Sequence, residues 1–440
     1  MLVGGWVRDF LLQIPSFDYD LEVYGLRPEI LKSILDGYGE VNVVGEAFTV
    51  YKLRIDELTV DVSIPRRESK TGRGHRGFTI VGDPDMSFAE ASRRRDFTIN
   101  SMLYDPLTNE VIDPYGGQED LRKRILKVTD RKTFAEDSLR VLRAMQLASR
   151  LNYTIEKETV RICRDISLSD LPAERIWAEV EKWLLLSLKP SIGFQAAFDL
   201  GIAEKLWPEL YALKGCPQDP EWHPEGDVDI HTSMVIDEAR KLIDDLDKPR
   251  KLTVMLGALC HDFGKPLTTR PENGRIRSKG HEDAGIQPTD SFLHKLNVNT
   301  VGGYHVRNQV KALVASHLAP NHFYKSTLKG DKVSDGAFRR LAGRVDPELL
   351  YRVARADCLG RTGDFKPEAE EWFIDKVRAL GVVDGPPAKL LLGRHLIDLG
   401  VEPGPRMREL IDSVYELQLD GKITSLEEAI AAAKVQIKTT

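Results

Sequence analysis

Two glycines and two aspartates near the start of the chain have the types and spacing of a phosphoryl-transfer site. Gly4 and Gly5 lack Cβ atoms, so backbone N–H groups there can approach a phosphate closely. Asp18 and Asp20 follow at i and i+2, a spacing that points both carboxylates the same way in a β-strand and lets them share divalent cations. A DxD pattern alone is also common in loops and helix caps. The adjacent glycine pair favours metal-dependent nucleotidyl transfer.

A third carboxylate is needed to complete such a site. Two-metal phosphoryl transfer uses carboxylates that hold two cations about 4 Å apart. Asp61 lies in the β-type run 58–62, where its side chain would be costly to bury without a metal. We therefore predict that Asp18, Asp20 and Asp61 are catalytic and that they bind Mg²⁺.

A basic cluster at residues 93–95 supplies groups that could bind a triphosphate. Three consecutive arginines can form bidentate contacts with phosphate oxygens. Asp96 and Asn100 offer an acceptor and an amide for ribose hydroxyls. The alternative is a basic segment at the start of an ordinary helix, with Asp96 as its cap.

The elements that must position these groups change character along the chain. Residues 1 to about 130 contain short β-type runs at 2–3, 21–24, 41–44, 49–53 and 58–62, which predicts a small mixed sheet domain. From about 131 onward helical periodicity dominates, with helices expected over 136–145, from 172 through 177, near 407–419 and over 426–434. A Pro/Gly/Asp-rich passage from 215 to 229 is expected to be a domain linker. The fold class we predict is α+β.

Composition limits the class of protein. The chain has 440 residues, which favours two to four domains, and its formal net charge of -6 does not exclude local basic surfaces for nucleic acid. Charged residues make up 30%, no run of about 18 apolar residues occurs, and the start lacks a secretory pattern, so we expect no membrane partner. Four scattered cysteines without a CxxC pair favour a reducing compartment. We expect a cytoplasmic protein.

The second half carries histidines and carboxylates that suit a divalent metal. His231, the adjacent pair His261-Asp262, His281, His317 and Asp357 fall in one region. Imidazole and carboxylate are ligands of mixed nitrogen and oxygen sites, and an adjacent His-Asp pair can bridge metals. A lone histidine is more often structural. The ordered set favours a metal site.

Five motifs occur in an order that resembles the class II tRNA nucleotidyltransferase and bacterial poly(A) polymerase family. They are Gly4-Gly5-Trp6-Val7-Arg8-Asp9, Asp18-Tyr19-Asp20, Arg94 to Asn100, Asp113-Pro114-Tyr115-Gly116-Gly117 and Glu136-Asp137-Ser138-Leu139-Arg140. The resemblance implies a nucleotidyltransferase head at 1–130, a helical neck for nucleotide selection and RNA binding at 131–215, a third domain at 216–365 and a helical, tRNA-binding tail at 366–440. It further implies that Gly4, Gly5, Arg8, Arg95 and Arg143 bind phosphates.

Asp137 and Arg140 allow a prediction about base choice. At i and i+3 on the expected helix they would share a face and present an acceptor beside donors. Cytosine and adenine both show an exocyclic amino donor next to a ring-nitrogen acceptor, whereas uracil and guanine show a carbonyl and an N–H. Such a pair would select C and A, with Glu136 orienting the arginine, as protein-templated CCA addition requires. An intrahelical salt bridge of about 0.3 kcal/mol is the alternative.

Two segments and one departure bear on the subgroup. Residues 45–50 and the loop within 65–78 look like the CCA-adding branch, and no Arg-rich strand of the polymerase branch is present there. The family commonly continues the helix with an arginine and a phenylalanine, where this chain has Gln146 and Leu147. This departure weakens the assignment of one further phosphate contact.

The histidine set resembles an HD-domain phosphohydrolase. Residues 260–265, 280–282 and 356–357 carry the resemblance. It implies a divalent metal of unknown identity on four ligands, with His281 and His317 lining the pocket or binding a second metal; the four are His231, His261, Asp262 and Asp357. An HD domain behind a nucleotidyltransferase resembles bacterial multifunctional CCA enzymes, which are associated with phosphatase, 2'-nucleotidase and 2',3'-cyclic phosphodiesterase activities.

The function predicted is addition of C, C and A to the 3' end of tRNA from CTP and ATP, with a second, HD-domain phosphohydrolase activity. A poly(A) polymerase or a partial CC- or A-adding enzyme is the alternative within the family. A metal-dependent phosphohydrolase with an RNA-binding module is the alternative from another class. We expect a monomer or a homodimer.

Overall fold

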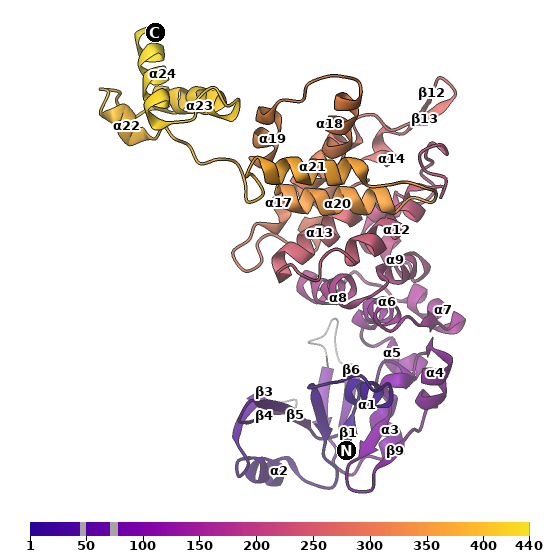
Figure 1. Cartoon of the computed structure of the whole chain (residues 1–440). Coiled ribbons are helices and arrows are strands. Elements are labelled where there is room, and N and C mark those ends of the chain that lie inside the picture. The colour runs from indigo at the N-terminus through magenta and orange to yellow at the C-terminus, as the bar shows by residue number, and fades with distance from the viewer. Residues whose placement is uncertain (45–49, 71–77, 440) are drawn as a thin grey trace. The chain divides into compact units, whose positions relative to one another are not determined.

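A seven-stranded mixed sheet forms from the short β-type runs of the first 112 residues, with the order β3-β4-β5-β2-β1-β8-β9. All neighbouring pairs are antiparallel except β2 and β5, which run parallel. The strands are β1 (Leu2–Val3), β2 (Tyr19–Glu22), β3 (Glu40–Val44), β4 (Val50–Ile55), β5 (Leu58–Ser63), β8 (Leu103–Asp105) and β9 (Glu110–Ile112). In this computed structural model the described residues are 1–44, 50–70 and 78–439 (Figure 1).

The alternation of β5 determines which face of the sheet is buried. Val60 and Val62 are buried in a core with Leu31 and Leu35 of helix α2 (Pro28–Leu35). Because side chains alternate along a strand, Asp61 points to the opposite face. The core therefore forms on one face and leaves the carboxylates on the other.

Shorter elements complete the first part of the chain. A separate hairpin pairs β6 (Arg66–Lys70) with β7 (Phe78–Gly82), and β10 (Ile125–Leu126) pairs in parallel with β11 (Thr154–Ile155). The helices are α1 (Gly5–Leu11), α3 (Phe88–Arg93), η1 (Thr98–Asn100) and α4 (Gly117–Lys123). Residues 45–49 and 71–77, which carry most of the subgroup prediction, lie outside the described residues.

Helices then follow to the end of the first compact unit, residues 1–208. They are α5 (Arg131–Phe134), α6 (Leu139–Leu151), α7 (Lys157–Asp165), α8 (Ala173–Leu186), α9 (Pro190–Asp199) and α10 (Ile202–Leu206), and α11 (Pro208–Tyr211) crosses into the second unit. Helix α6 packs against α8 and α9 and buries an apolar face that includes Leu142 and Met145.

The second unit, residues 209–440, is helical apart from one hairpin. Its core packs α12 (Val228–Arg240), α13 (Lys248–Cys260), α17 (Val306–Ser316) and α20 (Pro347–Leu359) against one another. The other elements are α14 (Lys265–Thr268), β12 (Arg270–Glu272), β13 (Arg275–Arg277), α15 (His281–Ala284), α16 (Ile286–Lys295), α18 (Ala319–Leu328), α19 (Asp335–Ala342), α21 (Glu368–Ala379), α22 (Gly393–Ile397), α23 (Pro405–Leu419) and α24 (Leu426–Thr439).

The predicted fold class is confirmed, since a mixed sheet is followed by helices. Two local expectations are wrong. The helix expected from residue 136 begins at Leu139, and the passage from 215 to 229 is more than a linker, because it contributes buried side chains to the second unit. Across the described residues, no helix is both long and apolar enough to cross a membrane. All four cysteines are buried and free.

Candidate functional site

Asp18, Asp20 and Asp61 come together at the parallel strands β2 and β5. Asp20 pairs directly with Asp61 in the register of these strands, and Asp18 lies two residues before Asp20. Burial, together with the neighbouring charges of Asp18 and Asp61 and against the opposing effect of Arg95, raises the pKa of Asp20 to about 6. Three carboxylates that repel one another in this way form a site suited to a divalent cation.

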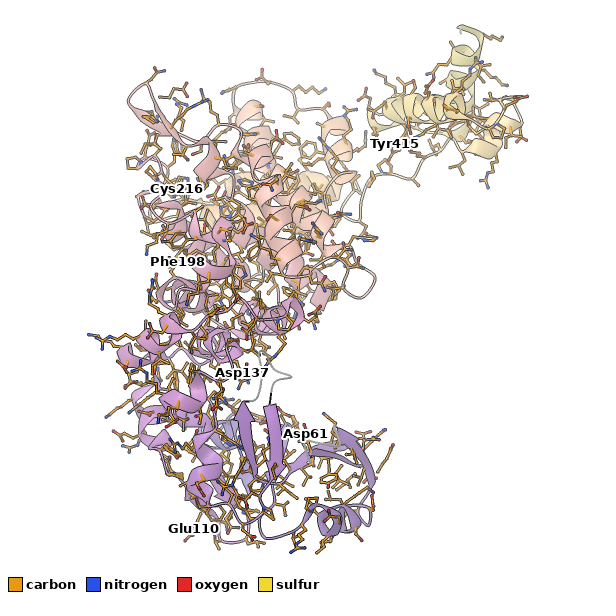
Figure 2. All side chains as sticks on the ribbon, turned by 180° about the vertical axis from the view of Figure 1, so that it is seen from behind. Asp61, Glu110, Asp137, Phe198, Cys216 and Tyr415 are labelled. Atoms are coloured by element: carbon orange, nitrogen blue, oxygen red, sulfur yellow. The ribbon has the colours of Figure 1, made fainter. Side chains whose placement is uncertain are left out.

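Asp61 is more exposed than its position in a strand suggested. Its side chain is 36% exposed, and its Oδ1 lies 3.3 Å from Lys52 Nζ on β4. Figure 2 shows Asp61 on the sheet. The burial cost on which we first selected Asp61 is therefore small. Its direct pairing with Asp20 is the stronger evidence for a shared role.

Gly4 leaves room for the Arg95 guanidinium close to these carboxylates. Its φ of 72° lies in the left-handed region, and a Cβ atom there would lie 2.9 Å from Arg95 Nη1 and 3.4 Å from Asp20 Oδ2. Any larger residue would displace the guanidinium. The predicted neighbours Gly4, Arg95 and Asp20 therefore meet in space.

Glu22 holds the arginines in place, and sequence reasoning missed it. Its carboxylate is fully buried, accepts from Arg94 Nη2 at 2.6 Å and from the Tyr24 hydroxyl at 2.7 Å, and lies 3.8 Å from Arg95 Nη2. Burial alone would raise the pKa of Glu22, but the two arginines outweigh it and lower that pKa. The signal was present, because Asp18, Asp20 and Glu22 follow one another at every second residue.

Arg8, Asp96, Asn100 and Arg143 belong to one hydrogen-bond network, in which the first three are buried. Arg8 Nη1 donates to Asn100 Oδ1 at 2.8 Å, and Arg8 Nε donates to Asp9 at 2.8 Å. Asn100 Nδ2 donates to Asp96 Oδ1 at 3.0 Å, and Arg143 Nε donates to Asp96 Oδ2 at 2.8 Å. Burial would raise the pKa of Asp96, but Arg143 and Asn100 outweigh it and hold that pKa at about 2.

This network changes the expected roles. Arg8 is 4% exposed, Asn100 is 4% exposed and Asp96 is 7% exposed, so their polar atoms are engaged with protein groups. The geometry does not present Asn100 and Asp96 to ribose hydroxyls. It makes them supports that fix Arg143, whose side chain is 36% exposed.

Asp137 and Arg140 lie one turn apart, but not in the way we expected. Asp137 precedes α6, and its backbone carbonyl accepts from the N–H of Arg140 at 3.1 Å. Its carboxylate pairs with Arg175 of α8 at 3.1 Å, whereas Arg140 donates to the backbone carbonyls of Thr133 and Arg94. The expected placement of both residues on one helix face is therefore wrong, because Asp137 precedes α6, and each side chain has anchors of its own (Figure 2 labels Asp137).

The remaining residues of this motif are placed around the same turn. Glu136 lies in the turn between α5 and α6 and is half-buried. Gln146 and Leu147 are buried in α6, with 3% and 4% exposure. The two residues that depart from the family pattern therefore serve the packing of the helices.

The second unit gathers six predicted metal-site residues. His261 Nδ1, His281 Nδ1 and His317 Nδ1 each lie 2.7–2.8 Å from a backbone carbonyl oxygen three residues earlier. With Nδ1 donating, each Nε2 carries the lone pair that a metal requires, and the Nε2 atoms of His281 and His317 face each other at 3.2 Å. Burial lowers the pKa of His317 to about 3, and this keeps the ring neutral.

The side-chain atoms that could bind a metal belong to two adjoining groups of three residues, which we call triads. His231, His261 and Asp357 make one, and Asp262, His281 and His317 make the other; in each, the atoms lie within 4.8 Å of one another. His261 Nε2 and Asp262 Oδ1 are buried without a hydrogen-bond partner in the described part of the chain. Buried nitrogen and oxygen atoms without a hydrogen-bond partner fit ligands of a divalent metal. The adjacent pair His261-Asp262 places one such residue in each triad.

Two groups around the triads, Glu225 and Arg361, were missed, and a third, Lys265, stood in the HD motif without an assigned role. Glu225 Oε1 lies 2.8 Å from His231 Nδ1 and 2.9 Å from His223 Nδ1, so a carboxylate orients this histidine where a carbonyl orients the others. Lys265 Nζ donates to Gln218 Oε1 at 2.6 Å and lies 2.7 Å from Asp262 Oδ2. Arg361 Nη2 lies 3.1 Å from Asp357 Oδ1. Glu225, His223 and Gln218 lie in the passage from 215 to 229, which gave no helical pattern.

A pocket of about 260 Å³ opens onto the triads. Metal-site residues line it together with cations and apolar side chains; they include Asp262, His281, His317 and Asp357, and also Lys265, Lys325, Arg361, Trp222, Ile276 and Leu318. A pocket with this lining can hold a phosphate ester against metal ligands.

Family models match three parts of the chain. The model of the poly A polymerase head domain matches residues 1–127, and the model described as the probable RNA and SrmB-binding site of polymerase A matches residues 152–213. The HD domain model matches residues 228–362.

Curated relatives are similar over most of the chain. A "Multifunctional CCA protein" of Stenotrophomonas maltophilia (strain K279a) is 36% identical over 82% of this chain and 86% of its own length. One of Pasteurella multocida (strain Pm70) is 36% identical over 82% of this chain and 84% of its own length.

Solved structures share the fold. The Thermotoga maritima CCA-adding enzyme complexed with tRNA matches 99% of this chain and 90% of its own with a TM-score of 0.60 at 19% identity. The Bacillus stearothermophilus CCA-adding enzyme in complex with CTP matches 100% and 93% with a TM-score of 0.64 at 20% identity. With identity above 30% over four fifths of its length, the chain belongs to the family of multifunctional CCA proteins.

Proposed function

We propose that this protein adds C, C and A to the 3' end of tRNA from CTP and ATP. The observation that carries the proposal is the register pairing of Asp20 with Asp61 beside the Gly4–Arg95 contact, in a chain of this family. The terminal ribose 3'-hydroxyl attacks the α-phosphate, a new P–O bond forms, and the bond to the β-phosphate breaks. Pyrophosphate leaves, and the hydroxyl proton passes to solvent.

The residues of the first unit have distinct roles in this reaction. Asp18, Asp20 and Asp61 would hold Mg²⁺, which when bound activates the hydroxyl and neutralises the leaving pyrophosphate. Arg95, fixed by Glu22, offers its guanidinium to the triphosphate beside Gly4. Arg143, fixed by Asp96, offers a second cation.

Base selection is assigned to Asp137 and Arg140. Both are half-buried at the start of α6, and one turn of backbone separates them. An acceptor beside donors matches the edges of cytosine and adenine and rejects those of uracil and guanine. Arg175 and the carbonyls of Thr133 and Arg94 hold the two side chains in position until the base replaces part of these contacts.

The test is nucleotide addition to tRNA that lacks its three terminal nucleotides. Asp20→Asn should reduce the addition rate by at least ~100-fold, because the shared metal loses a charged ligand. Glu110→Gln is the matched control, since Glu110 is an exposed carboxylate on the edge strand β9 of the same sheet and should leave the rate unchanged. Addition by Asp20→Asn at the wild-type rate would overturn the proposal.

We infer a second activity, metal-dependent hydrolysis of phosphate esters, at the HD site. The two triads support this activity, because they include buried nitrogen and oxygen atoms without a hydrogen-bond partner in the described part of the chain. A water oxygen attacks phosphorus, the P–O bond to the ribose oxygen breaks, and the leaving oxygen takes a proton. Lys265 and Arg361 place positive charge at the pocket, where phosphate oxygens would lie.

The measurement is formation of adenosine 2'-phosphate from adenosine 2',3'-cyclic phosphate with added divalent metals tried one at a time. His261→Ala should abolish this ring opening. His294→Ala, which removes an exposed histidine at the end of α16, should not change it. Equal rates for wild type and His261→Ala would contradict the assignment.

A further inference from the structure

The pocket at the HD site continues beyond the metal ligands. A second, adjoining pocket shares Asp219, Trp222, Ile276, Ser278, His281 and Leu318 with the first. Three of these side chains are apolar, namely Trp222, Ile276 and Leu318. A site that binds only inorganic phosphate or a small phosphate ester has no need of such an apolar wall.

Trp222 is the largest apolar side chain of this wall. Its side chain is 44% exposed although an indole gains from burial, so a flat apolar surface faces the pocket. Its backbone is fixed, because its N–H donates to the carbonyl of Asp219 at 3.1 Å. The next residue, His223, stacks edge-on against the metal ligand His231 with ring centroids 4.6 Å apart. The indole therefore lies within a nucleotide's reach of the triads.

Lys325 is the cation of the pocket that remains available for a ligand. Lys265 is engaged with Asp262 and Gln218, and Arg361 with Asp357. Lys325 Nζ lies 5.1 Å from the ring centroid of Trp222, and within the described ranges no carboxylate forms an ion pair with it. A cation over one face of an exposed indole can contact a phosphate while the opposite face of the ring stacks on a base.

We propose that Trp222, with Lys325, forms a nucleoside subsite, so that the HD site selects nucleotides over base-free phosphate esters. The ligand is a ribonucleotide whose base stacks on the indole between Ile276 and Leu318 while its phosphate reaches the triads. This inference rests on the proposed phosphohydrolase function and names its substrate class.

The experiment compares two secondary phosphate monoesters, adenosine 2'-phosphate and glycerol 2-phosphate, by release of inorganic phosphate. Base stacking on an aromatic side chain is worth about 1–3 kcal/mol, so Trp222→Ala should lower kcat/KM for the nucleotide by roughly 10- to 100-fold. The base-free ester should change less than about twofold, because it makes no stacking contact. Trp222→Phe keeps an aromatic face and should restore most of the nucleotide rate. An equal loss on both esters, or no loss on either, would overturn the subsite.

A binding measurement separates this inference from the hydrolase proposal. Calorimetric titration of adenosine 2'-phosphate into wild type, Trp222→Ala and Lys325→Gln requires no turnover. If hydrolysis is absent but Trp222→Ala weakens binding by roughly tenfold or more, the subsite stands and the hydrolase assignment fails. If turnover is present but all three proteins bind the nucleotide equally, the subsite fails and the hydrolase assignment stands.

Discussion

At the scale of single residues, the nucleotidyl-transfer site depends on its arginines and equally on the carboxylates that hold those arginines in place. Glu22 is fully buried and anchors Arg94 and Arg95, while Asp96 anchors Arg143. Removing a buried carboxylate that pairs with arginines is strongly destabilising, because the arginine charges then lack a partner. The two carboxylates therefore keep the arginine side chains oriented before a triphosphate binds.

The first prediction concerns Glu22→Gln. It leaves two arginines without their shared carboxylate and should lower the free energy of unfolding by about 3 kcal/mol, measured by urea denaturation. It should also raise KM for CTP and ATP, since Arg95 loses its orientation. Tyr24→Phe removes only one hydrogen bond to the same carboxylate and should cost about 1 kcal/mol. Equal effects of the two substitutions would show that Glu22 does not act through the arginines.

The second prediction concerns pH. The pKa of Asp20 is raised to about 6 by burial and by its acidic neighbours, so the fraction of ionised Asp20 falls as the pH drops through 6. Only the ionised carboxylate binds metal, and the Mg²⁺ concentration for half-maximal addition should therefore rise by about tenfold per pH unit below 6. Assays at pH 5, 6 and 7.5 measure it. A half-maximal concentration that is the same at all three values would contradict the role of Asp20.

At the scale of elements, the sequence predicted a strand from its hydrophobic alternation and the residues of the sites from the order of their motifs. The alternation of residues 58–62 located β5, and the ordered motifs located the histidines and carboxylates that the structure brings together in the triads. It could not predict Glu225 or Trp222, because a Pro/Gly-rich passage carries no periodic pattern and only its tertiary contacts give it a role. The start of α6 was missed by three residues because Asp137 bonds Arg175 and the N–H of Leu139 in the preceding turn.

The third prediction concerns the close approach of α14 and α15. A Cβ atom on Gly264 would lie 2.0 Å from the carbonyl oxygen of His281 and 2.6 Å from the N–H nitrogen of Gly285, both backbone atoms that cannot swing aside. Gly264→Ala should therefore separate Asp262 from His281 and reduce phosphate-ester hydrolysis by at least ~10-fold. Gly404→Ala, just before α23 in the same unit, has no atom within 4 Å of its new Cβ on an extended backbone with φ 169°, and it is the control for steric contact. Hydrolysis that survives Gly264→Ala intact would contradict the packing argument.

At the scale of the whole molecule, each site draws its ligands from one unit. Asp18, Asp20 and Asp61 lie in residues 1–208, and the triads lie in residues 209–440. Among the described residues, those that we assign to one site and those that we assign to the other lie in different units. Nucleotide addition and phosphate-ester hydrolysis can therefore be carried by one chain and lost one at a time.

The fourth prediction is this separation. Asp20→Asn should abolish nucleotide addition and leave hydrolysis of adenosine 2',3'-cyclic phosphate within about twofold of wild type, and His261→Ala should do the reverse. Both variants are compared for thermal unfolding to confirm that they fold. Loss of both activities in either folded variant would contradict two independent sites.

The most direct test of CCA addition is to supply each nucleoside triphosphate alone, and CTP with ATP, to tRNA that lacks its three terminal nucleotides and to read product lengths. The account predicts two additions from CTP alone, three from CTP with ATP, no further extension and negligible use of UTP and GTP. Incorporation of UTP or GTP as readily as CTP and ATP would contradict base selection by Asp137 and Arg140. A tail that grows past the third nucleotide would identify a poly(A) polymerase, and a stop after CC with both nucleotides present would identify a partial enzyme.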